Sequence, residues 1–599
     1  MKENKERIAK LKEILKQEGV DYYIVPTADF HNSEYVNAYF KVRAFLSGFT
    51  GSAGNLVISQ KEAGLWTDGR YFVQAEKELV DSDVVLYKMG EEGVPTIEQY
   101  LEEHVREGQT IGFDGRVVEA SFGEKLEKMF AGKNVTFSFK KDLADSIWTD
   151  RPEMPVSKLW VVPDEMSGKT AGEKLAQVRT EMKKHNAAHL VISKLDDIMW
   201  LYNIRANDVD CNPVALAYTF ISENEAILFV QEKAVTEEAK AYLSKHGVTI
   251  REYSEIITFL ESVKVEGKIW CSAKNTNYLL LKILEQRGEV LNQDNPTTLL
   301  KAMKNPVEME NIRKFYLLDS VTLTKFLFWM KQNAGIVPMD EMSVAAKLDH
   351  MRSEIEGFLD LSFPTISAYK ENAAMAHYSA SEDDKKDIEA DGFYLVDSGA
   401  QYVGGTTDVT RTIVLGKITD EMKLHFTKVA CSMLRLADTK FLYGCTGRSL
   451  DIIAREPLWE CGLDYKHGTG HGIGYILNVH EGPQSIRWQY IEGAKETVLE
   501  EGMIVSDEPG MYIEGSHGIR TENIVEVVKE EKNEFGQFMA LRHLTYVPID
   551  LDAIDTKYME ASDIDRLNAY HAEVYKRLAP YFESEEKEML KNATRQISR

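Results

Sequence analysis

The sequence predicts a multidomain protein of mixed α/β and α+β class. Its 599 residues are enough for about four domains of ordinary size. The order helix, strand, strand occurs twice in the first half, and helices alternate with paired strands in the second half. We therefore expect two similar α/β domains at 1–160 and 161–303, an α+β domain at 304–548, and a helical C-terminal extension at 549–599.

The first domain opens with an amphipathic helix, because Ile8, Leu11 and Leu15 recur at helical spacing. Gly19 ends this pattern. Apolar strands are then expected at 22–25, 55–58 and 64–67.

The second domain repeats this plan. A helix containing Leu175, Val178 and Met182 leads into strands, which are expected at 188–192, 197–200, 215–218 and 226–230. Two copies are too few for a solenoid, so tandem domains are the better interpretation.

The third domain begins near 301–306, where Pro306 lies close to the start of a helix that carries Met309 and Ile312. Near the C-terminus, residues at helical spacing predict one more amphipathic helix; they are Ile564, Leu567, His571, Val574 and Leu578.

Charge and composition exclude several functions. Lys plus Arg number 71 and Asp plus Glu number 96, so the formal net charge is −25. Such a chain repels phosphates at long range, which argues against nucleic acid and anionic membranes as partners. No uncharged apolar run reaches the roughly 18 residues that span a bilayer.

The cysteines and the N-terminus predict a reducing compartment. The five cysteines are odd in number and form no C-x-x-C motif, so we expect reduced thiols and no disulfide framework. The charged N-terminal residues open no apolar segment, so we expect no signal peptide and a cytoplasmic location.

Chemically informative residues are concentrated between 377 and 522. Asp397 ends the apolar run 392–396, and Asp408 precedes an alternating segment in which it shares a face with Thr410 and Thr412. Gly404 and Gly405 lie between the two aspartates, so a hairpin or an adjacent strand pair would bring both carboxylates together. Taken alone, the pair is equally compatible with a turn aspartate beside an unrelated surface aspartate.

The segment 467–474 reads His-Gly-Thr-Gly-His-Gly-Ile-Gly. His467 and His471 have the i, i+4 spacing of a zinc-binding helix, but four glycines in eight residues disfavour a helix. We expect an extended segment that lets a backbone or a ligand approach closely, with a flexible loop as the alternative. His480 adds a third imidazole.

The carboxylate pattern occurs a second time with glutamates. Glu508 follows the apolar strand 502–505 at a Pro-Gly turn, and Arg520 and Glu522 share one face of the segment 518–525. Four carboxylates and one imidazole suit Mn²⁺, Mg²⁺ or Co²⁺, and also Zn²⁺ in a two-metal site. Carboxylates can bridge two cations about 3.5–4 Å apart.

These motifs together resemble the metallopeptidases of the pita-bread fold, in which two pseudo-symmetric halves enclose a dinuclear metal site. The remainder of the chain is similar to the large three-domain Xaa-Pro aminopeptidases of the aminopeptidase P type. The segments that carry this second likeness are 47–54, 67–71, 193–205, 208–213, 304–308 and 544–548. The resemblance implies two tandem creatinase-N-like domains followed by a pita-bread catalytic domain.

Carried over by position, the resemblance implies five metal ligands: Asp397, Asp408, His471, Glu508 and Glu522. Asp408 and Glu522 would bridge both metals, while His471 and Glu508 would complete the shell of one. The implied cofactor is a pair of divalent ions, Mn²⁺ first, with Co²⁺ or Zn²⁺ as alternatives.

The resemblance also implies roles for residues around the metals. His377 would steady the substrate, His467 would lie near the proline pocket, and His480 would contact the scissile-bond region. Arg520 would hold Asp397 in place, and Tyr512 would lie on the substrate side.

The implied reaction is removal of one N-terminal residue from a peptide with proline in second position. Two metals would lower the pKa of a shared water, and the resulting hydroxide would attack the carbonyl between the first residue and proline. Glu508 would carry its proton towards the leaving nitrogen, and His480 or His377 would hydrogen-bond the developing oxyanion.

Three further expectations accompany this hypothesis. The nearest alternative is a prolidase, which cleaves only Xaa-Pro dipeptides and usually carries one N-terminal domain. A second alternative is a pita-bread module that only binds partners, although such modules typically lack metal ligands. By analogy, we expect a homodimer formed through the catalytic domain.

Overall fold

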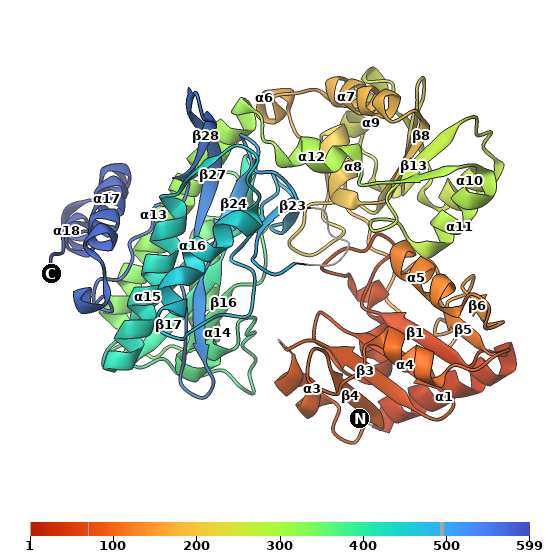
Figure 1. Ribbon diagram of the computed structural model, residues 1–599, viewed down its shortest axis with the longest axis horizontal. Coiled ribbons are helices and arrows are strands. Elements are labelled where there is room, and N and C mark those ends of the chain that lie inside the picture. Colours follow the sequence, from red (N-terminus) through yellow and green to blue (C-terminus); the bar gives the residue numbers. More distant parts are fainter. Residues whose placement is uncertain (1, 70, 491–495) are drawn as a thin grey trace. The chain divides into compact units, whose positions relative to one another are not determined.

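The computed structural model describes residues 2–69, 71–490 and 496–599, and the chain divides into two compact units (Figure 1). Unit 1 contains Met1–Val162 and Lys169–Thr297, and unit 2 contains Pro163–Gly168 and Thr298–Arg599. Arg70, part of the 67–71 motif, lies outside the described residues.

Unit 1 contains two six-stranded sheets. The strands of the first are β1 (Tyr22–Pro26), β2 (Asn55–Ser59), β3 (Ala63–Thr67), β4 (Val84–Lys88), β5 (Thr110–Phe113) and β6 (Thr136–Ser138). Those of the second are β8 (Ala187–Ile192), β10 (Ala217–Ser222), β11 (Ala226–Val230), β12 (Thr249–Arg251), β13 (Lys268–Cys271) and β14 (Val290–Asn292). A separate strand pair joins β7 (Trp160–Val161) to β9 (Ile204–Arg205).

The two sheets have one topology. The first runs β4-β3-β2-β1-β5-β6 and the second runs β12-β11-β10-β8-β13-β14, so each copy has the same order of its first to sixth strands. The central strands β1 and β8 both pair antiparallel with the next strand and parallel with the fifth. The repeated domain plan predicted from the sequence is confirmed.

Helices accompany the strands of unit 1 (Figure 1). They are α1 (Lys2–Glu18), α2 (Val42–Ser47), α3 (Phe72–Glu78), α4 (Ile97–His104), α5 (Ala120–Phe130), α7 (Ala171–Lys184), α8 (Leu195–Tyr202), α9 (Glu237–Lys245), α10 (Ile256–Ser262) and α11 (Tyr278–Arg287). The helix α12 (Pro296–Ala302) spans the sequence boundary between the units.

One predicted strand is wrong. Residues 197–200 belong to the helix α8, whose first turn contains Asp196 and Asp197, where negative side chains favour a helix N-terminus. Asn203 ends this helix with a left-handed φ of 50°. All eight helical residues are buried, so the helix has no polar face, and its periodicity could not be distinguished from that of a buried strand.

Unit 2 contains the remaining strands. They are β15 (Phe358–Leu361), β16 (Ile366–Tyr369), β17 (Phe393–Ser398), β18 (Ala400–Tyr402), β19 (Gly405–Thr406), β20 (Val409–Val414), β21 (Lys440–Leu442), β22 (Gly470–Gly472), β23 (Glu481–Ile486), β24 (Ile504–Asp507), β25 (Gly510–Ile513), β26 (His517–Arg520), β27 (Asn523–Asn533) and β28 (Gly536–His543). The larger sheet runs β21-β28-β27-β24-β22-β23, and a smaller one runs β16-β17-β20.

Two strand pairs of unit 2 are built alike. β17 pairs antiparallel with β20, with Asp397 opposite Thr410, and β24 pairs antiparallel with β27, with Asp507 opposite Asn523. Each connection contains a short antiparallel strand pair, β18–β19 in the first, where β15 adds a third strand, and β25–β26 in the second. The two adjacent strand pairs that the sequence predicts around its carboxylates are therefore present.

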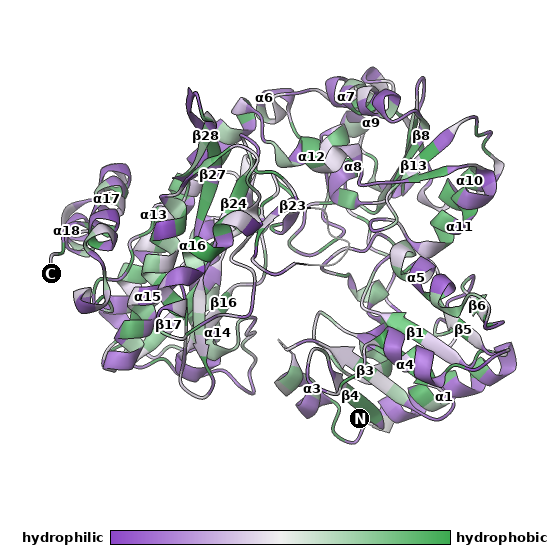
Figure 2. Cartoon of the chain, in the orientation of Figure 1, coloured by the Kyte–Doolittle hydropathy of each residue, from purple (hydrophilic) through white to green (hydrophobic). Residues whose placement is uncertain are grey.

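Besides α12, unit 2 contains seven α-helices among the described residues, some packed on the sheets and others on neighbouring helices. They are α6 (Asp164–Ser167), α13 (Pro306–Asn333), α14 (Glu341–Ser353), α15 (Asp420–Ala437), α16 (Gly447–Trp459), α17 (Ala561–Leu578) and α18 (Ser584–Ala593). One hydrophobic cluster joins α13 and α14 to β16, β17 and β20, and a larger cluster joins α15, α16 and α17 to β24, β27 and β28. Figure 2 shows hydrophobic colours on parts of β24 and β27, and both colours on α15 and α16, as on amphipathic helices.

Two other expectations can be compared with the structure. All five cysteines are free in the structure. Within the described ranges, no helix combines the length and the apolar character needed to cross a bilayer.

His571, on α17, predicts a pH dependence of stability. Its Nε2 accepts a hydrogen bond from the Ile549 N–H at 3.1 Å, and burial lowers its pKa to about 3. An unfolded histidine, with a pKa near 6.5, binds a proton that the folded one rejects. This contribution to stability is complete above about pH 6.5 and falls as the pH drops towards 3.

We therefore expect the free energy of unfolding to fall by about 2 kcal/mol between pH 7 and pH 5 through His571 alone. Urea unfolding of the wild type and of His571→Gln at both pH values measures this, because the other histidines titrate in both proteins. Equal pH dependence in the two proteins would contradict it.

Candidate metal centre

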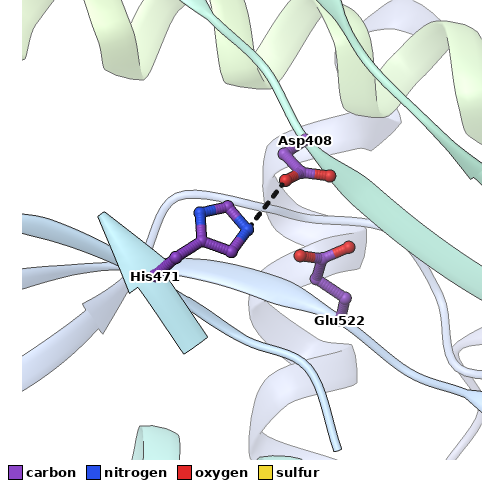
Figure 3. Close-up of side chains that lie close together, drawn as sticks. All are labelled: Asp408, His471 and Glu522. Atoms are coloured by element: carbon purple, nitrogen blue, oxygen red, sulfur yellow. Dashed lines mark ion pairs between the residues drawn. The ribbon is translucent and has the colours of Figure 1, made fainter. Parts of the chain in front are cut away.

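Three side chains from separate segments of unit 2 converge. Asp408 directly precedes β20, His471 lies in β22, and Glu522 lies between β26 and β27. One potential ligand atom from each lies within 4.8 Å of the other two. Figure 3 shows the imidazole of His471 directed at the Asp408 carboxylate, with the Glu522 carboxylate beside both. The His471 Nε2 atom lies 3.5 Å from Asp408 Oδ2.

Glu508 joins this group from the end of β24. Its Oε1 atom lies 3.5 Å from His471 Nε2, and its backbone N–H donates to the Thr469 carbonyl at 2.8 Å. The Ser506 hydroxyl donates to Glu508 Oε1 at 3.1 Å and accepts from the His471 N–H at 2.9 Å. Ser506 thus fixes Glu508 and His471 relative to each other.

Asp397 is oriented by Arg520. The Arg520 Nη2 donates to Asp397 Oδ2 at 2.6 Å, its Nε donates to the Thr410 hydroxyl at 3.2 Å, and its Nη1 donates to the Tyr512 hydroxyl at 2.7 Å. The other carboxylate oxygen, Asp397 Oδ1, is buried and has no hydrogen-bond partner among the described residues. An orphaned buried carboxylate oxygen is costly unless a cation binds it.

Thr410 connects the two carboxylate-bearing strand pairs. Its hydroxyl donates to Glu522 Oε2 at 2.7 Å, and its carbonyl accepts from the Glu522 N–H at 3.1 Å. The aspartate pair and the glutamate pair are therefore held together by both backbone and side-chain hydrogen bonds.

Two glycines make the approach of these strands possible. A Cβ on Gly470 would lie 1.8 Å from the Ser506 carbonyl oxygen, and one on Gly472 would lie 2.2 Å from the Glu481 carbonyl oxygen. Only glycine fits at these positions. The expectation that the histidine–glycine segment is extended, with close backbone neighbours, is confirmed.

The electrostatics of the group favour a cation. Burial raises the pKa of Asp397, Glu508 and Glu522, and neighbouring carboxylates raise each of them further. Burial would lower the pKa of His471, but Asp408 and Glu508 outweigh it and raise this pKa to about 9. Oxygen donors with one imidazole match the ligand preferences of divalent transition metals. These residues therefore fit divalent cations.

The three outer histidines have different surroundings. His467 Nε2 hydrogen-bonds the Tyr512 hydroxyl at 2.9 Å, and burial together with the charge of Arg520 lowers the pKa of His467 to about 3. The charge of His377, which lies in a turn after β16, also lowers the pKa of His467. His377 is therefore close to His467 in space. The ring of His480 is centred 4.4 Å from that of His471.

His480 adjoins a buried charge cluster. The next residue, Glu481, accepts from Lys301 Nζ at 2.7 Å and also from Lys304 Nζ, and all three side chains are at most 1 % exposed. Because Glu481 begins β23, this cluster fixes the backbone next to the His480 imidazole.

Sequence reasoning missed several supporting residues. The sequence places Thr410 on the same face as Asp408 but indicates no role for it. The only sequence signal for Ser506 is that it alternates with Glu508. Tyr316, on α13, lies close enough to Asp408 and Glu522 for their charges, added to burial, to raise its pKa well above the usual value. No pattern in the sequence indicates that contact or the lysine cluster.

Family models match almost the whole chain. Residues 7–142 and 150–308 each match the Creatinase/Prolidase N-terminal domain, and residues 310–529 match metallopeptidase family M24. Residues 537–597 match the C-terminal region of peptidase M24.

Curated relatives are similar over nearly their full lengths. Aminopeptidase P1 of Arabidopsis thaliana is 37% identical, with 97% of each chain covered. Probable Xaa-Pro aminopeptidase P of Tuber melanosporum is 38% identical, over 97% of this chain and 96% of the relative.

Solved structures are also similar to this chain. The X-prolyl aminopeptidase from Caenorhabditis elegans, described as a cytosolic enzyme with a di-nuclear active site, has a TM-score of 0.93 and 34% identity, with 99% of each chain covered. The prolidase from Pyrococcus horikoshii OT3 has a TM-score of 0.51 and 24% identity, over 63% of this chain and 99% of the prolidase, which is a likeness of fold.

Metal binding should stabilise the protein measurably. A cation among these carboxylates removes their repulsion, and a ligand at 100 times its Kd adds about 2.7 kcal/mol of stability. We expect Mn²⁺ to raise the Tm of chelator-treated protein by roughly 5 °C in differential scanning fluorimetry.

A matched pair of variants identifies the site. Glu522→Gln should reduce this rise. Glu526→Gln should retain it, because Glu526 lies on β27 but pairs with Arg313 outside the group. A wild-type Tm indifferent to divalent ions would contradict the assignment.

Proposed function

The chain belongs to metallopeptidase family M24, and we propose that it is a metal-dependent Xaa-Pro aminopeptidase. It would hydrolyse the bond between an N-terminal residue and a following proline. One observation carries the proposal: ligand atoms of Asp408, His471 and Glu522 lie within 4.8 Å of one another, with Glu508 3.5 Å from His471, in a chain that matches Xaa-Pro aminopeptidases over 97% of its length. The proposed domains are 1–160, 161–303 and 304–548, with an extension at 549–599.

The proposed cofactor is a pair of divalent metal ions, with Mn²⁺ first and Co²⁺ or Zn²⁺ as alternatives. The residues that would hold them are Asp397, Asp408, His471, Glu508 and Glu522. When bound, two such ions supply Lewis-acid chemistry, which lowers the pKa of a water and polarises a carbonyl. The di-nuclear active site described for the Caenorhabditis elegans enzyme supports this number of ions.

Residues of the chain would move and hold the proton. Glu508 is the proposed proton carrier, because burial raises its pKa and so increases its basicity. His480, whose ring adjoins that of His471, would donate a hydrogen bond to the substrate carbonyl oxygen. His377 would contact the same region from the turn after β16.

Another set of residues would fix the geometry. Arg520 would hold Asp397 and Tyr512 through its hydrogen bonds to both. His467, hydrogen-bonded to Tyr512, would line the side of the proline ring as a neutral imidazole, because its pKa is lowered to about 3. The second substrate residue would be selected as a ring that brings no N–H donor.

Two alternatives are less well supported. A prolidase is expected to carry one N-terminal domain, and unit 1 has two sheets of one topology. A buried carboxylate cluster is destabilising without a cation, so we do not expect one in a module that only binds partners.

The proposal includes a cytoplasmic location and a homodimer. The location rests on the cytosolic description of the Caenorhabditis elegans enzyme. The dimer would form through unit 2, where apolar side chains on α16 and after β23 are 40–61% exposed; they are Ile452, Trp459, Trp488 and Tyr490. Trp459 and Trp488 contact each other edge to face at 6.1 Å between ring centroids.

Removal of Glu508 or Asp408 tests the reaction. We expect Glu508→Ala and Asp408→Ala to lower kcat/KM for Arg-Pro-Pro by on the order of 10³-fold or more, because each removes a cation ligand and Glu508 also carries the proton. Chelation should do the same. Release of arginine, measured by chromatography, reports the rate.

The control is again Glu526→Gln, which should hydrolyse Arg-Pro-Pro normally. The dipeptide Ala-Pro, offered in parallel, distinguishes the prolidase alternative, since an aminopeptidase should prefer Arg-Pro-Pro. Near-normal turnover by Glu508→Ala would reject the role of that residue.

Sedimentation tests the dimer. We expect the wild type to sediment with the mass of two chains. Trp459→Asp should sediment closer to the mass of one chain, because a charge in an apolar interface is costly. A monomeric wild type at micromolar concentration would exclude the dimer.

A further inference from the structure

Arg411, on β20, is a buried cation with an unusual environment. It is 1% exposed, and among the described residues none of its hydrogen-bond acceptors is a carboxylate. Its acceptors are the carbonyls of Thr410 (2.9 Å), Glu522, Val547 (2.8 Å) and Pro548 (3.2 Å), the Asn523 Oδ1 (2.7 Å) and the Tyr570 hydroxyl (3.0 Å). A buried guanidinium is tolerated only when its donors are satisfied in this way.

These bonds enclose Glu522. The same guanidinium nitrogen of Arg411 donates to the carbonyl of Glu522 and to that of Thr410, whose hydroxyl donates to the Glu522 carboxylate. A second nitrogen holds the side chain of Asn523, the next residue. Arg411 thus contacts the Glu522 backbone carbonyl and the side chain of the following residue, while Thr410 connects it to the Glu522 carboxylate.

The C-terminal helix completes this arrangement. Tyr570, on α17, accepts a hydrogen bond from Arg411 Nη2 and donates to the Val547 carbonyl at 2.8 Å. Its ring packs against that of His543, with centroids 4.9 Å apart, and its side chain is 5% exposed. The Tyr570 hydroxyl, 159 residues away in sequence, is therefore one of three acceptors of the Arg411 Nη2, together with Asn523 Oδ1 and the Val547 carbonyl.

Charge adds a second reason for this placement. Four carboxylates share a buried region, and Arg520 contacts Asp397 from one side. Arg411 brings a second positive charge to the Glu522 side, and a guanidinium keeps that charge at all physiological pH values. The orientation of the Arg411 guanidinium and its distance from Glu522 depend on the acceptors around it, including Tyr570.

We propose that Tyr570 is a positioning residue for the metal centre: through Arg411, the C-terminal extension sets the place of the Glu522 carboxylate. This inference rests on the proposed function, in which Glu522 would be one of the residues that hold the cations. Groups that orient a metal ligand typically change metal affinity or activity by about 10–100-fold when removed.

The test uses the full-length protein and removes one oxygen atom. Tyr570→Phe keeps the ring and its packing but removes the hydroxyl. Tyr575→Phe is the matched control, because Tyr575 lies on the same helix and packs against the same hydrophobic cluster. Mn²⁺ binding to chelator-treated protein is measured by isothermal titration calorimetry, together with the Tm without metal and the kinetics with Arg-Pro-Pro.

We expect Tyr570→Phe to bind Mn²⁺ about 10-fold more weakly and to lose kcat with KM nearly unchanged, while Tyr575→Phe matches the wild type. Wild-type Mn²⁺ affinity in Tyr570→Phe, with or without a lower Tm, would overturn the proposal and leave only a docking role. An equal loss in Tyr575→Phe would overturn it too.

A second variant covers the case in which Tyr570→Phe fails to fold. Arg411→Lys keeps the charge but cannot reach the same set of oxygens, so it should lose Mn²⁺ affinity in a folded protein. Failure of both variants to fold would reject the positioning role. If the wild type itself neither binds Mn²⁺ nor cleaves Arg-Pro-Pro, the proposed function fails; if it does both and Tyr570→Phe is unchanged, only this inference fails.

Discussion

The repulsion among three buried carboxylates and the half-buried Glu508 is the constraint on which unit 2 depends. Asp397, Asp408, Glu508 and Glu522 come from different strand ends, and their charges oppose one another at low exposure to water. Burial of this group is costly, because Arg520 and His471 are few positive partners for four carboxylates. The arrangement becomes reasonable when divalent cations are part of the folded state.

The rest of the scaffold keeps these groups from moving apart. Antiparallel pairing brings Asp397 opposite Thr410, and Thr410 reaches across to Glu522. Glycines at 470 and 472 allow the histidine strand to lie against its neighbours without side chains between them. Positive charges stand at the edge of the group, with Arg520 at Asp397 and Arg411 behind Glu522. Strands rather than a mobile loop therefore hold these potential ligands in place.

Much of the fold could be predicted because its signals are local. The helix α1 and the strands β1 to β3 follow from apolar spacing over a few residues, and the duplicated order follows from repeating that spacing. The helix α8 could not be predicted, because it is buried on every side and has no polar face. The partition into two compact units, with Pro163–Gly168 assigned to the second, depends on packing against α13, which no local pattern encodes.

For the site, the sequence by itself determined which residue types are available, that they stand at strand ends, and that two carboxylate pairs share one plan. Those properties depend on neighbours within about a dozen positions. The family resemblance implied that Arg520 holds Asp397, 123 residues away, but only the tertiary structure decided that Thr410 reaches Glu522 across 112 residues and that Tyr570 reaches Arg411 across 159. The physical reason is that such contacts arise when sheets and helices pack, and side-chain periodicity records which face is buried but not which partner it meets.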